Sequence, residues 1–67
     1  MSNYEKAYEL SKLNRNIQKE MDSIDDPKKK KALAELQEEI AQKTADGVKM
    51  SENDLRYLQQ KYDLKVA

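Results

Sequence analysis

The stretch KMSENDLRYLQQKYDLKVA, residues 49–67, carries the most complete set of helix-start signals in this chain. Ser51 and Asp54 have the spacing of a capping box, with Asp in the place that Glu or Gln usually holds. Met50 and Leu55 stand where the two ends of a hydrophobic staple would stand. These signals predict that a helix begins immediately after Ser51.

The predicted helix, approximately residues 52–66, is apolar on two sides. Its main stripe repeats at helical spacing and consists of Leu55, Leu58, Tyr62 and Val66. Tyr57 and Leu64 are seven residues apart and fall on the opposite side of the helix. The main stripe predicts a core face with the Tyr62 hydroxyl at its rim. The second side, and the lack of any helix-ending residue before Ala67, lead us to expect further helix from a longer parent chain or from another chain.

Two earlier segments have the same amphipathic character. The first, approximately residues 3–23, places five apolar side chains within about 120° of each other on a helical wheel: Leu10, Leu13, Ile17, Met21 and Ile24. The second, approximately residues 27–45, has the stripe Leu33, Leu36 and Ile40, extended by Thr44. Both segments are therefore predicted to be helices with one buried face.

The second predicted helix has two further expected features. Ala34, Ala41 and Ala45 flank its apolar stripe, and such small side chains would let a neighbouring helix approach closely. Glu39 and Lys43 are four residues apart, which favours an ion pair along the helix worth a few tenths of a kcal/mol.

Two short interruptions separate the predicted helices. In DSIDDP, residues 22–27, Pro27 suits the first position of a helix, and Asp25 or Asp26 suits the cap before it. In ADGVKMS, residues 45–51, Gly47 suits the left-handed geometry that ends a helix, with Val48 as the accompanying apolar contact.

Short connections make neighbouring helices antiparallel. The chain is therefore predicted to form one all-α domain over residues 1–67, a small up-down-up three-helix bundle. If one turn straightens, the alternative is a helical hairpin or an extended coiled-coil segment.

Composition restricts the chemistry that this chain can perform. Ala, Glu, Lys, Leu and Arg make up about half of its 67 residues, which is typical of long helices. Cys, His, Phe and Trp are absent, so the chain lacks disulfides, thiolate or imidazole metal ligands, and the usual pairs of nucleophile and base. We expect no catalytic residue, no metal site, no cofactor and no enzymatic activity.

A run of four lysines is the most prominent charged feature of the sequence. The run Lys28–Lys31 could contact phosphates, but it fans around a full helical turn, has acidic neighbours and has no interleaved aromatic to stack on bases. With 13 basic and 13 acidic residues, the chain also has no overall field that attracts nucleic acid. Nucleic-acid binding is not expected, and the role of the lysine run stays open.

Carboxylates gather in two places that could suggest cation binding or paired acid and base catalysis: Asp22, Asp25 and Asp26, and Glu35, Glu38 and Glu39. The first group lacks the alternating spacing and central glycine of a calcium loop. The second has no recessed apolar surroundings that would separate two carboxyl pKa values. Capping and a solvated helix face are the expected roles.

No apolar run approaches the roughly 18 residues that a membrane-spanning helix requires, and no secretory signal is visible at the start of the chain. We expect no membrane association. The expected location is the cytoplasm or a virion.

Three tyrosines and one leucine make up the candidate partner face: Tyr4, Tyr8, Tyr57 and Leu64. All of them fall outside the main apolar stripes, and tyrosine is enriched where a protein surface meets a partner. Scattered exposed apolar side chains are also ordinary on a monomer. The expected partners are other helices, through self-association or within a larger parent chain, or one other protein.

Three phrases in order, YELSKLNRNI, LQEEI and MSENDLRYLQQKYDLKVA, resemble helical stretches of tail tape-measure and related virion structural proteins of tailed bacteriophages. The resemblance implies a long, largely helical, non-enzymatic parent that occupies the tail tube, sets its length and has no functional residues to transfer to this segment. This chain is far too short to span a tail, so the resemblance implies an excised piece or a small protein of similar helical style. A small independent helical binding module or regulator is the alternative.

Overall fold

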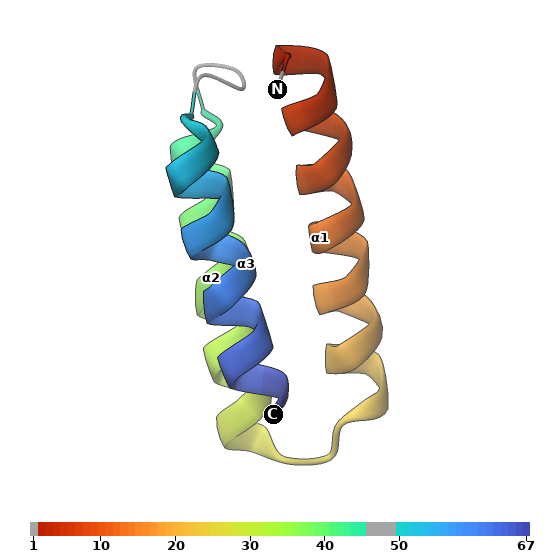
Figure 1. Ribbon diagram of the computed structural model, residues 1–67. Coiled ribbons are helices and arrows are strands. Elements are labelled where there is room, and N and C mark those ends of the chain that lie inside the picture. The colour runs from red at the N-terminus through yellow and green to blue at the C-terminus, as the bar shows by residue number, and fades with distance from the viewer. Residues whose placement is uncertain (1, 46–49) are drawn as a thin grey trace.

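The computed structural model describes residues 2–45 and 50–67, which form three α-helices: α1 (Asn3–Ser23), α2 (Pro27–Lys43) and α3 (Glu52–Val66). In Figure 1, α1 descends from the N-terminus, α2 rises beside it and α3 descends to the C-terminus, so the two termini lie at opposite ends. Each helix contacts both of the others. The prediction of an all-α, up-down-up bundle is confirmed, and the extended alternative is not the structure.

Each helix begins at a side-chain cap. The Ser51 hydroxyl accepts a hydrogen bond from the Asp54 backbone N–H at 3.2 Å, and the Asp54 carboxylate accepts one from the Ser51 N–H at 3.4 Å, which completes the predicted capping box. At α2, Asp26 rather than Asp25 is the cap, and it accepts from the Lys28 N–H at 2.9 Å. The Ser2 cap of α1 was not predicted; its hydroxyl accepts from the backbone N–H three residues later at 3.1 Å.

The end of α2 differs from the prediction. The helix ends at Lys43 rather than at residue 45, with Thr44 as its C-cap. The Thr44 hydroxyl donates to the Ile40 carbonyl at 2.8 Å and to the Ala41 carbonyl at 3.3 Å, and Thr44 is not among the side chains that pack against the apolar cluster, so it does not extend the apolar stripe. The predicted helix-ending roles of Gly47 and Val48 lie outside the described residues.

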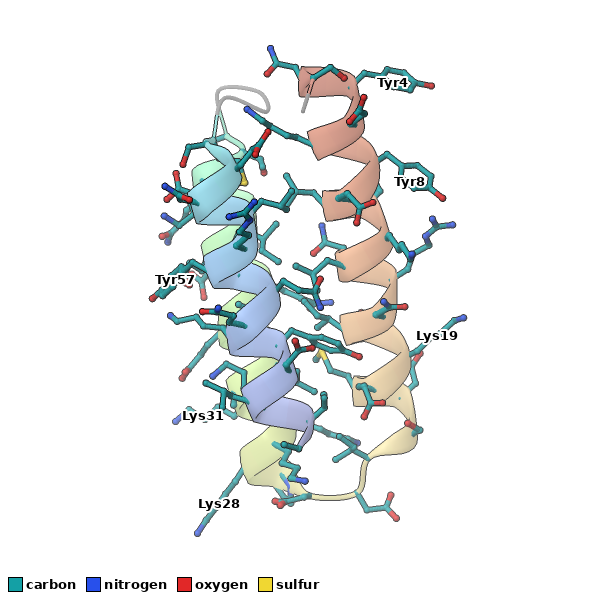
Figure 2. All side chains as sticks on the ribbon, in the orientation of Figure 1. Tyr4, Tyr8, Lys19, Lys28, Lys31 and Tyr57 are labelled. Carbon is teal, nitrogen blue, oxygen red and sulfur yellow. The ribbon has the colours of Figure 1, made fainter. Side chains whose placement is uncertain are left out.

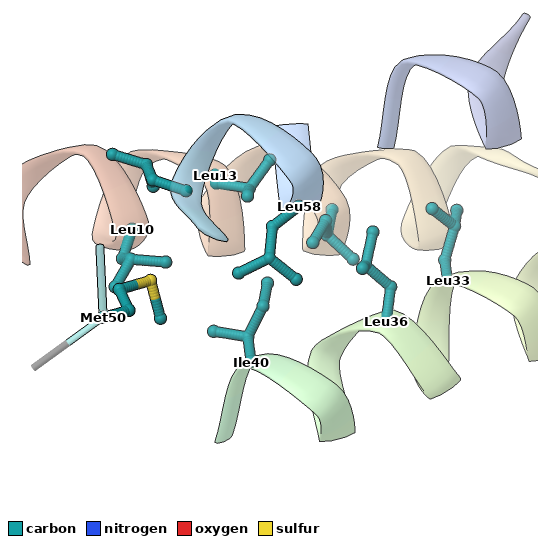
Figure 3. Packing of buried hydrophobic residues seen from close by; sticks show 9 residues of the cluster. Leu10, Leu13, Leu33, Leu36, Ile40, Met50 and Leu58 are labelled. Carbon is teal, nitrogen blue, oxygen red and sulfur yellow. The ribbon is translucent and has the colours of Figure 1, made fainter. Parts of the chain in front are cut away.

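The core lies along the shared axis of the three helices (Figure 3). Among the described residues, nine side chains are buried in it: Leu10, Leu13, Ile17, Leu33, Leu36, Ile40, Met50, Leu55 and Leu58. Met21, Ile24, Tyr62 and Val66 are partly buried against it. All three predicted stripes therefore meet, and Met50 and Leu55 enter the same cluster, as the hydrophobic staple requires.

One packing prediction for α2 was wrong. Ala34, Ala41 and Ala45 are all exposed, so they do not provide a close approach between helices inside the bundle. The reason is angular, because α2 buries the side centred on Leu33, Leu36 and Ile40, and the alanines project to its outer side.

Candidate interaction surfaces

The structure divides the candidate partner face into two surfaces. Tyr4 and Tyr8 project from α1, while Tyr57 projects from α3 on the other side of the bundle (Figure 2). The exposed fractions are 86% for Tyr4, 58% for Tyr8, 46% for Tyr57 and 78% for Leu64. The four residues are thus exposed, as predicted, but they cannot meet one partner on a single flat face.

The outer surface of α1 is aromatic at one end and cationic at the other; we call it the α1 face. Tyr4 and Tyr8, with Ala7 and Ser11, line a shallow hollow of about 230 Å³. Exposed Lys12, Arg15 and Lys19 follow at spacings of three or four residues. The face exists because α1 buries its opposite side in the core and neither α2 nor α3 covers the side that carries the tyrosines.

A lysine on the outer surface of α3 forms an ion pair with a glutamate of α2. The Lys61 ammonium donates to both carboxylate oxygens of Glu39 at 3.1 Å, and its nitrogen lies 4.8 Å from the centre of the Tyr57 ring. The Tyr57 side chain and then the Glu39 carboxylate raise the pKa of Lys61 above its ordinary value, and desolvation opposes them. Tyr57 is therefore partly engaged within the bundle, whereas Leu64 is not.

The contact between Glu39 and Lys61 replaces the predicted pair of Glu39 with Lys43. Sequence reasoning missed it because the partners are 22 residues apart and on different helices. Only the register of α3 against α2 brings them together, and no local spacing signals that register.

A groove of about 430 Å³ runs between α2 and α3 beside this ion pair. Its lining residues are Glu35, Leu36, Glu38, Glu39, Gln42, Lys61 and Lys65. Carboxylates dominate the α2 side and ammonium groups the α3 side, which is the character of a solvated, charge-balanced surface. Within residues 2–45 and 50–67, no three acidic side chains converge in a way that could hold a metal ion.

Tyr62 lies at the rim of the core, as its place in the main stripe predicted. Its ring is partly buried against the cluster. Burial raises the pKa of the Tyr62 hydroxyl above its ordinary value, and the nearby negative charges of Glu20 and Asp63 add to the shift.

The side chains of Lys28–Lys31 are all exposed, and Lys28 and Lys31 project from the lower part of α2 in Figure 2. In the part of the chain that the structure describes, none of these side chains forms an ion pair. The described residues place no aromatic ring among these lysines. The structure therefore gives no further support for nucleic-acid binding by the lysine run.

No family model matches this chain, and neither characterised proteins nor solved structures provide a similar one. None of the three described helices has the length and apolar character needed to cross a membrane. The function must therefore be inferred from the surfaces described above.

Proposed function

We propose that the chain is a non-enzymatic helical structural element of a phage-type virion or tail protein, whose outer faces meet neighbouring helices. The resemblance of its three helical phrases to tail tape-measure and related proteins supports the class of protein. The exposed apolar side chains outside the core support the role in helix packing.

The observation that carries this proposal is that large apolar side chains remain outside a core that is already formed. Nine other side chains build that core, yet Tyr4 stays 86% exposed and Leu64 stays 78% exposed. Full burial of one such side chain is favourable by about 1.5 to 3 kcal/mol, which the bundle alone does not recover. A neighbouring helix laid on either surface would recover it.

The alternative is a small independent binding module or regulator. The feature that favours it is the self-sufficiency of the bundle, because each helix begins with its own cap and all three share one apolar cluster. Such a module would present one helix face to a single target protein.

The genomic reading frame around this sequence separates the two proposals. An open frame that continues through further amphipathic helices supports the structural element, and a stop codon directly after Ala67 supports the module. If the frame continues, the flanking helical segments can be titrated into the isotopically labelled bundle.

In that titration, we expect backbone resonance shifts at Tyr57 and Leu64 with little change at Lys30, which lies on the exposed lysine run. Absence of shifts at millimolar concentrations of the flanking segments would contradict the structural proposal. Shifts confined to Lys28–Lys31 on addition of duplex DNA, lost at high salt, would favour nucleic-acid binding instead.

A further inference from the structure

The α1 face is a continuous exposed stripe that carries positive charge in its C-terminal part. Its members are Tyr4, Tyr8, Lys12, Arg15 and Lys19, and Figure 2 shows Tyr4, Tyr8 and Lys19 pointing away from the other two helices. In the described part of the chain, none of the three cations forms an ion pair. Carboxylates also border the stripe: Glu5 lies three residues before Tyr8, Glu9 three before Lys12 and Asp22 three after Lys19, and Asp22 accepts a hydrogen bond from Gln18 at 3.0 Å.

The outer side of α2, which we call the α2 face, carries negative charge at its centre, opposite to the positive charge of the α1 face. It consists of the exposed residues Lys31, Ala34, Glu35, Glu38, Ala41 and Gln42. Glu39, the neighbouring carboxylate, is already paired with Lys61. Among the described residues, Glu35 and Glu38 have no cationic partner within ion-pair distance, although Lys65 lines the same groove.

The heights of these charges along the bundle can be compared through one contact. The Gln37 side-chain amide donates to the Gln18 side-chain oxygen at 3.2 Å, so these two positions are level. α1 and α2 are antiparallel and have the same rise of about 1.5 Å per residue. Moving one residue toward the C-terminus of α1 therefore matches moving one residue toward the N-terminus of α2. Lys19 is thus level with position 36, and Arg15 with position 40.

This register aligns the two faces when a second copy stands beside the first in the same orientation. Lys19 of one copy then comes level with Glu35 and Glu38 of the other, and Arg15 with Glu38. Toward the other end, the same register takes Tyr8 past the end of α2 at Lys43, so the two faces overlap at their charged residues and not at this tyrosine.

We infer that the α1 face docks on the α2 face of a second copy of this chain, with the two bundles side by side. This inference rests on the proposed function and names one of the neighbouring helices. Parallel pairing of two α1 faces would place cations near cations, which is unfavourable. Because the two docking faces differ, each copy keeps one face of each kind free, and assembly continues beyond a dimer into a ring or an open row.

Sedimentation velocity over a series of protein concentrations tests the inference, because it measures assembly directly. The unaltered protein is expected to form species larger than a dimer at low salt and to dissociate at about 1 M salt, where the screening length falls to about 3 Å. Arg15→Glu with Lys19→Glu, or Glu35→Lys with Glu38→Lys, should weaken association by about tenfold or more.

The decisive variant combines all four substitutions, because it exchanges the signs of both faces. It should associate again, and so should a mixture of the two double variants. Lys29→Glu with Lys30→Glu is the matched control, since it changes the net charge as the α1 double variant does but lies outside both faces. Circular dichroism checks that every variant remains helical.

An unaltered protein that stays monomeric at millimolar concentration and low salt would overturn the inference. Failure of the four-substitution variant to associate while it remains helical would also overturn it. If the unaltered protein is monomeric but binds duplex DNA through Arg15 and Lys19, the α1 face serves an anionic partner instead. In each of these cases, resonance shifts at Tyr57 and Leu64 with the flanking segments would leave the proposed function standing.

Discussion

Single side chains hold the helix starts of this protein and tune the rim of its core. Ser2, Asp26 and Ser51 each accept a hydrogen bond from a backbone N–H that has no partner within its own helix. At the core rim, Tyr62 keeps its hydroxyl close to Glu20 and Asp63. The consequences of these contacts can be measured one substitution at a time.

Replacement of Ser51 tests the capping box. Ser51→Ala removes the acceptor for the Asp54 N–H and is expected to lower the free energy of unfolding by about 1 kcal/mol. Ser11→Ala is the matched control, because Ser11 is exposed within α1 and makes no side-chain hydrogen bond among the described residues. Urea unfolding followed by circular dichroism measures both, and equal midpoints for the two variants would contradict the cap.

The environment of Tyr62 should make the free energy of unfolding depend on pH in the alkaline range. Since the folded state raises the pKa of its hydroxyl, the folded state binds that proton more tightly than the unfolded chain. The resulting stability is present below the ordinary tyrosine value of about 10 and is lost as pH rises through the higher folded value. Lys61, whose pKa is also raised, acts in the same direction.

Tyr62→Phe should therefore flatten part of the fall in the free energy of unfolding above about pH 10. Urea unfolding repeated from neutral to strongly alkaline pH measures it, and the Lys61 contribution should persist. Tyr8→Phe, on the exposed α1 face, provides the comparison. A Tyr62→Phe variant with the same alkaline slope as the unaltered protein would show that the Tyr62 environment is described wrongly.

At the scale of elements, each helix divides its apolar residues between the core and the outer surface. Leu36 of α2 is 2% exposed and Leu64 of α3 is 78% exposed, although both are leucines in amphipathic helices. The ion pair between Lys61 and Glu39 adds a link between α2 and α3, but its groups are 36% and 28% exposed, so its contribution is small. Apolar burial is what joins the helices.

The two leucines form a matched test of that conclusion. Leu36→Ala is expected to lower the free energy of unfolding by about 2 to 5 kcal/mol, which threatens the fold of so small a domain. Leu64→Ala should change it by less than about 0.5 kcal/mol, because the side chain is already in water. Thermal unfolding under conditions where the protein is monomeric measures both, and similar effects would contradict the observed orientation of α3.

At the scale of the whole molecule, the bundle extends 36 × 20 × 16 Å with a radius of gyration of 11.8 Å. A domain of this length buries only around 60% of its unfolded surface, so its core is thin. All three helices contribute to the single apolar cluster. None of them can leave without exposing the side chains of the other two.

We therefore expect one cooperative unfolding transition for the monomer. Most of the stability of a helix in a protein comes from packing of its amphipathic face, so α2 and α3 should not persist once the shared core opens. Circular dichroism and the resonances of the core methyl groups should report the same midpoint. Separate loss of the α3 signals at a lower temperature would show that α1 and α2 form a stable hairpin without it.

Local patterns were enough to predict most of the fold. The apolar spacings in the three segments, the capping box at Ser51 and the proline after Asp26 all depend on neighbours within one helical turn. They predicted the residues that form the core and the starts of α2 and α3. The end of α2 was missed because a threonine can continue a helix or stand at its end, and its hydroxyl bond to the carbonyl four residues back is compatible with both.

The amino-acid sequence by itself determined that this chain forms amphipathic helices, because helical periodicity and capping are local properties. Only the tertiary structure decided the register of α3 against α2. That register makes Lys61, and not Lys43, the partner of Glu39. The tertiary structure also decided that the tyrosines divide between two surfaces and that Lys19 stands level with position 36 and Arg15 with position 40, each within two residues of a carboxylate of α2. Rotation and register between packed helices depend on how all the core side chains interlock, and no short stretch of sequence contains that information.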